Sequence, residues 1–144
     1  MPPSAIPQPD PQLRLRILFG PGAMMGPGKA DLLQAIADAG SIAAAGRAMG
    51  MSYKRAWQLV EVMNGIFSMP LVESSRGGAA GGGAALTAEG VRVLALYRAL
   101  EGHVAAAGAE ELAALVAMLR DRSGPVEASW SGDTSVQSDM SDGK

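Results

Sequence analysis

The chain has no cysteine and only one histidine, and these two shortages remove several classes of function. Without cysteine the chain can form neither a disulfide nor a thiolate metal site, and a reducing compartment is permitted although not required. One imidazole rarely makes a structural metal site by itself, so we expect His103 to be a surface residue. No serine in an elbow-like turn accompanies it to form a catalytic triad. We therefore predict no enzyme activity, no metal and no cofactor.

The sequence also lacks targeting and membrane signals. Its start has neither the basic flank nor the apolar run of a signal peptide, and no stretch of about 18 apolar residues occurs. A glycine-rich segment ends at Gly28-Lys29, as a phosphate-binding loop would. That motif requires a glycine and a hydroxyl residue where this chain has Ala23 and Ala30. We expect a cytoplasmic protein without a membrane span or a nucleotide site.

The net charge of −2 conceals an uneven distribution of charge. Residues 13–98 contain nine basic and five acidic side chains, whereas residues 99–144 contain three basic and eight acidic ones. A basic body with an acidic tail suits a nucleic-acid-binding protein better than the total charge suggests. Solvated tails often show such an imbalance as well, so charge alone does not decide the function.

Composition divides the chain into three parts. Residues 1–12 contain five prolines and no apolar period, and residues 120–144 are rich in serine, glycine and aspartate. We predict that both ends are disordered, because neither could bury enough apolar surface to offset chain entropy. Residues 13–119 remain as one domain with a modest core.

Within this domain, apolar periodicity and breaker residues predict a series of short elements. The expected order is a strand at 13–19, helices at 28–40, 42–49 and 52–67, a strand at 71–73, a glycine-rich loop and second strand within 76–86, and a long helix from 88 to about 119 that glycines 102 and 108 bend. Ser41, Ser52 and Thr87 are suited to cap the helices that follow them. The predicted fold is mainly α with a small β wing, a winged helix-turn-helix with a long C-terminal dimerisation helix.

The third predicted helix begins with a basic and polar segment. In a winged helix-turn-helix the N-terminal residues of this helix lie nearest to the base edges in the major groove. Lysine and arginine can donate to guanine, glutamine can pair with adenine, and serine and tyrosine can hold phosphate. The predicted DNA contacts on this helix are Ser52, Tyr53, Lys54, Arg55 and Gln58. The alternative is an ordinary amphipathic helix with a basic start, and we expect Trp57 to lie in the core.

A glycine-rich stretch follows Arg76 and continues to Ala85. Such a composition is typical of a flexible linker. It also suits a wing whose glycines allow the backbone to approach DNA, with Arg76 adding positive charge. Its position between a strand and a capped helix favours the wing, and Arg76 is the sixth predicted DNA contact.

Several motifs along the chain occur together in one known family. They are Gly40-Ser41-Ile42, Met51-Ser52-Tyr53-Lys54 with Ala56-Trp57, Met63-Asn64, Leu71-Val72-Glu73, Gly77-Gly78, Gly81-Gly82-Gly83-Ala84, Leu86-Thr87, Gly90 and Leu96-Tyr97. Residues 13–100 thereby resemble the N-terminal DNA-binding domain of the molybdate-responsive ModE regulators, and more distantly the LysR-type regulators. The Ser-Tyr-Lys-x-Ala-Trp block and the glycine-rich wing are the most specific features.

The resemblance implies a dimer that pairs through the first strand, the first helix and the long last helix. It also implies a palindromic DNA site read by Ser52, Tyr53, Lys54 and Arg55. The family binds molybdate in C-terminal domains made of small β-barrels. Residues after position 100 predict one helix and a tail, with no room for a barrel, so we do not expect them to sense molybdate.

A second function stays open at this point. Winged-helix domains also serve as protein-interaction modules, because a fold does not settle a function. Such a module would hold a partner protein with its apolar last helix and its acidic tail. A small-molecule site at the dimer interface is a weaker third alternative, since no convergent polar set indicates one.

Overall fold

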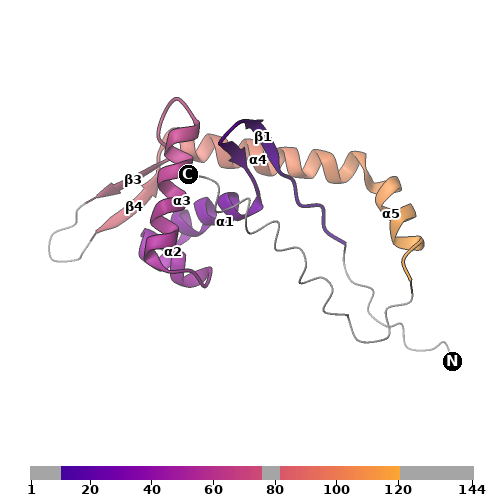
Figure 1. Cartoon of the computed structure of the whole chain (residues 1–144), viewed down its shortest axis with the longest axis horizontal. Helices are drawn as coiled ribbons and strands as arrows, with labels where there is room; N and C mark the ends of the chain where they lie inside the picture. Colours follow the sequence, from indigo (N-terminus) through magenta and orange to yellow (C-terminus); the bar gives the residue numbers. More distant parts are fainter. Residues whose placement is uncertain (1–10, 76–81, 121–144) are drawn as a thin grey trace.

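The structure is a computed structural model that describes residues 11–75 and 82–120, and helices dominate it (Figure 1). Its elements are β1 (Ile17–Gly20), β2 (Ala23–Met25), α1 (Pro27–Ala39), α2 (Ile42–Ala48), α3 (Tyr53–Ile66), β3 (Val72–Ser75), β4 (Gly83–Leu86), α4 (Ala88–Ala107) and α5 (Ala109–Ala117). The strands form two antiparallel hairpins, β1 with β2 and β3 with β4. The predicted class, mainly α with a small β wing, is confirmed. The ends predicted to be disordered lie almost wholly outside the described residues.

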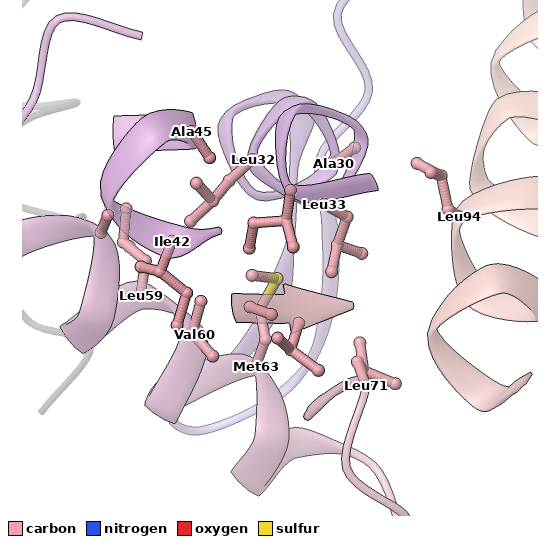
Figure 2. Packing of buried hydrophobic residues seen from close by; sticks show 14 of the residues in the cluster. Ala30, Leu32, Leu33, Ile42, Ala45, Leu59, Val60, Met63, Leu71 and Leu94 are labelled. Carbon is pink, nitrogen blue, oxygen red and sulfur yellow. The ribbon is translucent and has the colours of Figure 1, made fainter. Parts of the chain in front are cut away.

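The first three helices pack around one apolar cluster (Figure 2). Leu32, Leu33 and Ile36 of α1 are fully buried in it, and Met63 of α3 meets them from the opposite side. Fully burying a side chain of this size contributes roughly 1.5–3 kcal/mol relative to leaving it exposed. The helix ends where Gly40 takes a left-handed conformation with φ of 78°. This cluster anchors the inner face of α3.

A tight turn joins α2 to α3. Ser41 and Ser52 cap the two helices as predicted, because their hydroxyl oxygens accept hydrogen bonds from the backbone N–H three residues later, at 3.0 and 3.1 Å. Gly46 of α2 lies so close to Ala56 of α3 that a Cβ atom at position 46 would be 3.2 Å from the alanine methyl group. Small residues at both positions therefore allow the two helices to approach each other closely.

The N-terminal segment differs from the prediction of one strand over residues 13–19. Strand β1 begins only at Ile17, and a second strand, β2, returns after a turn that was expected only to end the strand. The turn contains Gly20 and Gly22, both with positive φ, of 148° and 73°. Two glycines in this conformation reverse the chain rather than merely interrupt it. Residues 13–16, where apolar and basic residues alternate, precede the hairpin and have no regular secondary structure.

The backbone between α3 and β3 is held from two sides. From α3, the Asn64 side chain accepts the N–H groups of Leu71 and Val72 at 2.8 and 3.1 Å, and it donates to the Val72 carbonyl at 3.2 Å. From the start of α4, the Thr87 hydroxyl donates to the Pro70 carbonyl at 2.7 Å, and the Thr87 N–H donates to the Leu71 carbonyl at 2.9 Å. One segment thus fixes the wing against both α3 and α4.

The C-terminal helix is interrupted once within the described residues. A bend at Gly102 and Gly108 was predicted, but α4 continues through Gly102 and ends only at Gly108, where α5 begins. Figure 1 shows the second half of α4 and all of α5 extending away from the three-helix core. Although α4 has 20 residues, no helix in the described ranges has both the length and the apolar character needed to cross a bilayer.

Replacement of Gly90 by alanine tests the packing of α4 on the wing segment, the backbone from Pro70 to Val72. A Cβ atom at this position would lie 2.1 Å from the Leu71 carbonyl oxygen, so the backbone must move and the Thr87–Leu71 hydrogen bond must weaken. We expect Gly90→Ala to lower the free energy of unfolding by about 3 kcal/mol. Urea denaturation at a fixed protein concentration measures this change.

The matched control is Gly102→Ala in the same helix, where a Cβ atom would meet nothing within 4 Å. Alanine there should raise the stability by about 0.5–1 kcal/mol, because glycine is unfavourable inside a helix. Equal effects of the two substitutions would contradict the packing that we describe.

Candidate nucleic-acid interface

Helix α3 has one buried and one exposed face. Ala56, Leu59, Val60 and Met63 are buried at helical spacing against α1 and α2. On the opposite face, Lys54, Gln58 and Glu61 are exposed at intervals of three to four residues. The helix therefore presents a stripe that runs from basic at its N-terminus to acidic two turns later.

The structure brings five of the six predicted DNA contacts together at the start of α3. Ser52, Tyr53, Lys54 and Gln58 are exposed, and Arg55 is half-buried on the flank of the stripe. The Ser52 oxygen accepts a hydrogen bond from the Arg55 N–H, so the cap itself uses one of these five residues. The sixth contact, Arg76, lies outside the described residues.

The prediction that Trp57 belongs to the core is wrong, because its side chain is 46% exposed. Trp57 follows Ala56 by one residue, which is about 100° around a helix. Because Ala56 is fully buried at the centre of the inner face, the indole is turned toward solvent. This spacing from the buried stripe was the signal in the sequence that could have revealed the exposure of Trp57.

Asn64 is a second residue whose role the sequence did not reveal. Its amide hydrogen-bonds to Leu71 and Val72, as described above, and so ties the C-terminal end of α3 to the wing. Asn64 follows Trp57 by seven residues, about two helical turns, so both lie on the same flank of α3. The exposed indole is therefore on the side of α3 that faces the wing segment.

The basic charge near α3 is not all at the surface. Lys29 of α1 was counted with the basic body, but it is only 8% exposed, and its Nζ donates to the Met24 carbonyl at 2.8 Å. Burial lowers the pKa of Lys29, and the positive charges of Arg16 and Arg55 lower it further. Lys29 joins the β1–β2 hairpin to α1, and Lys54 and Arg55 supply the positive charge at the start of α3.

The wing begins and ends on described residues. Strand β3 pairs with β4 in a register that places Val72 opposite Leu86 and Ser75 opposite Gly83. The Ala84 N–H of β4 donates to the Gly40 carbonyl at 2.9 Å, so the hairpin also contacts the end of α1. The base of the wing is thereby fixed on the same three-helix core that positions α3.

Three packed helices, a helix-turn-helix with an exposed basic start and a two-stranded wing together define a winged helix-turn-helix domain. Residues 29–91 match the bacterial regulatory helix-turn-helix proteins of the LysR family.

Individual relatives that match the same region identify a narrower group of proteins than the LysR family does. The molybdenum-pterin-binding protein MopB of Rhodobacter capsulatus is 47% identical over 89 residues, which are 62% of this chain and 33% of MopB. The transcriptional regulator ModE of Haemophilus influenzae is 40% identical over 90 residues, 62% of this chain and 35% of ModE. The DNA-binding transcriptional dual regulator ModE of Escherichia coli K12 is 44% identical over 71 residues, 49% of this chain and 27% of that protein.

The chain therefore carries a ModE-like helix-turn-helix domain, as its sequence motifs predicted. The matched region is 27–35% of the length of these relatives.

The buried Lys29 predicts a dependence of stability on pH. In the unfolded chain the lysine keeps its proton up to a pKa near 10.5, whereas in the folded protein the pKa is lower. Between the two pKa values the unfolded state binds more protons, so stability contributed by Lys29 rises with pH. We expect the unaltered protein to gain stability relative to Lys29→Met as the pH rises from 7 to 10.5. The free energy of unfolding of the unaltered protein minus that of the variant should therefore increase over this range.

Urea denaturation of both proteins across this range measures the effect. Comparing the two cancels other groups that titrate there, including Tyr97, whose pKa burial raises. Parallel stability curves for the two proteins would show that Lys29 titrates normally.

Proposed function

We propose that this chain is a DNA-binding transcriptional regulator that acts in the cytoplasm as a homodimer on a palindromic site. The exposed start of α3 carries the proposal, because Tyr53, Lys54 and Gln58 point away from the core at the end of the helix that this fold inserts into the major groove. Relatives named as transcriptional regulators match over the same region and support it.

The residues at the start of α3 have chemistries that suit different parts of DNA. Lys54 and Arg55 can donate to guanine O6 and N7, and Gln58 can pair with the N6 and N7 edge of adenine. The Ser52 oxygen is already a helix cap, but its hydroxyl proton remains available for a phosphate, as does that of Tyr53.

Dimerisation is proposed from the apolar surface of the last two helices. Half-exposed or exposed apolar side chains follow α4 and continue past α5: Val91, Leu96, Leu100, Val104, Leu115, Met118 and Leu119. No residue of α5 is buried in the described chain. Apolar surface of this extent usually marks an interface, and pairing of two copies along these helices would bury it.

A dimer would also explain how a small domain achieves specificity. Two α3 helices in successive major grooves would lie about 34–36 Å apart and read two half-sites related by the dimer axis. We propose that Arg76 adds a contact from each wing to the DNA phosphate backbone.

The second candidate function is a protein-interaction module. The same exposed apolar residues of α4 and α5, such as Leu96 and Leu115, favour it, because a different protein could cover them. The basic start of α3 distinguishes the two functions, since a module that binds only protein does not need it.

Selection of duplexes from a random DNA pool at two salt concentrations tests DNA recognition. We expect one enriched palindrome, and affinity that falls steeply with salt because phosphate contacts release counterions. Arg55→Ala should weaken binding to this palindrome by about 1–3 kcal/mol if Arg55 reads a base. Lys54→Ala together with Arg55→Ala should abolish enrichment.

Arg92→Ala is the matched control, because it removes one exposed positive charge from α4 and leaves α3 unchanged. It should keep the enriched sequence. Weak, sequence-independent binding by the unaltered protein, abolished at moderate salt, would favour the protein-interaction module. An equal loss for Arg55→Ala on the palindrome and on random duplex would make Arg55 a phosphate contact.

Leu96→Glu tests the dimer. A carboxylate at this exposed position of α4 would be buried without a partner in the proposed interface. Sedimentation equilibrium should show a dimer for the unaltered protein and a monomer for the variant, with weaker binding to the palindrome. Ser68→Glu, in the exposed loop after α3, is the charge-matched control and should remain dimeric. A monomeric unaltered protein would refute the proposal of a homodimer.

A further inference from the structure

An aromatic side chain is exposed within the polar surface of α3. Trp57 is 46% exposed, and its exposed neighbours are Tyr53 and Lys54 one turn before and Glu61 one turn after. A large indole in water is unfavourable because it leaves apolar surface uncovered. The apolar surface proposed for the dimer lies on α4 and α5, on other elements than Trp57. The proposed dimer would therefore leave the indole uncovered, and a different partner is needed to cover it.

The DNA major groove offers one apolar group on its base edges. Guanine, cytosine and adenine are distinguished there by hydrogen-bond donors and acceptors, whereas thymine alone adds a C5 methyl group. An indole face that covers this methyl removes apolar surface of both partners from water. A lysine, arginine or glutamine on the same helix cannot make this contact as well, because each carries its polar group at the tip.

We propose that Trp57 is a specificity residue that packs on a thymine methyl group in each half-site. The inference rests on the proposed function, because it places α3 in the major groove. Trp57 lies four residues after Tyr53, a rise of about 6 Å along the helix, and so contacts bases beyond those reached by the first turn. Each half-site should accordingly contain a thymine that is recognised through its methyl group and not through a hydrogen bond from α3.

The direction of the indole is fixed by the fold. Trp57 shares its flank of α3 with Asn64, whose amide hydrogen-bonds to Leu71 and Val72 and prevents rotation of the helix about its own axis. Ala56, fully buried beside it, fixes the same rotation from the core side. A side chain held in this way can select one base position.

Replacement of thymine by deoxyuridine tests the interaction, because it deletes only the methyl group. The duplex is the palindrome enriched by the unaltered protein, with uracil placed at one thymine position of both half-sites at a time. We expect the affinity of the unaltered protein to fall about fourfold for each methyl group that Trp57 no longer covers. Trp57→Ala should bind the thymine duplex more weakly and should bind the thymine and uracil duplexes equally.

Two variants serve as controls. Gln58→Ala removes a neighbouring exposed side chain and should keep the preference for thymine over uracil, whereas Trp57→Phe should keep part of it. Fluorescence supplies a readout independent of affinity: Trp57 and Trp130 are the two tryptophans of the chain, so Trp130→Phe leaves Trp57 as the only indole. Binding of the palindrome should protect its emission from quenching by iodide.

The outcomes separate this inference from the proposed function. Suppose that the protein enriches a palindrome whose affinity does not change on uracil substitution, or changes equally in Trp57→Ala. Either result overturns the thymine contact but not the proposed regulator function. Failure of the unaltered protein to enrich any sequence overturns both. An iodide-accessible Trp57 in the bound state likewise overturns the thymine contact.

Discussion

The short stretch of backbone from Pro70 to Val72 holds the parts of this domain together. Asn64 of α3 and Thr87 at the start of α4 bind its carbonyl and N–H groups from opposite sides. Leu71 is fully buried, so each polar group left without a partner there would cost about 1–3 kcal/mol. Gly90 completes the junction, because any side chain at this position would collide with the Leu71 carbonyl. The base of the wing is therefore hydrogen-bonded to both α3 and the start of α4.

This junction determines what α3 presents to its surroundings. The buried stripe centred on Ala56 fixes one side of the helix, and Asn64 fixes its C-terminal end, so Lys54 and Gln58 must face outward. The same packing also determines which positive charges reach the surface. Lys29 is not one of them, because it is buried and donates a hydrogen bond to the β1–β2 hairpin. The proposed base recognition needs such rigidity, because it tolerates little rotation of the helix in the groove.

Two exposed apolar surfaces have different physical meanings. The surface of α4 and α5 repeats along the helices, as expected of an interface that another helical surface covers. Trp57 instead is a single indole on the exposed surface of α3, next to Tyr53 and Lys54, and this suits a contact with one small apolar group. The proposed dimer and the proposed thymine contact thus arise from separate surfaces, and each can fail without the other.

The sequence by itself determined the local structure: the helix caps Ser41 and Ser52, the inner stripe of α3 and the mainly α class with a wing. These depend on residues three or four positions apart, which the sequence displays directly. It also identified the polar start of α3 as the candidate site. Only the tertiary structure decided that β2 pairs with β1 and that Lys29 is buried. Burial depends on how segments distant in sequence pack, and no local pattern encodes that arrangement.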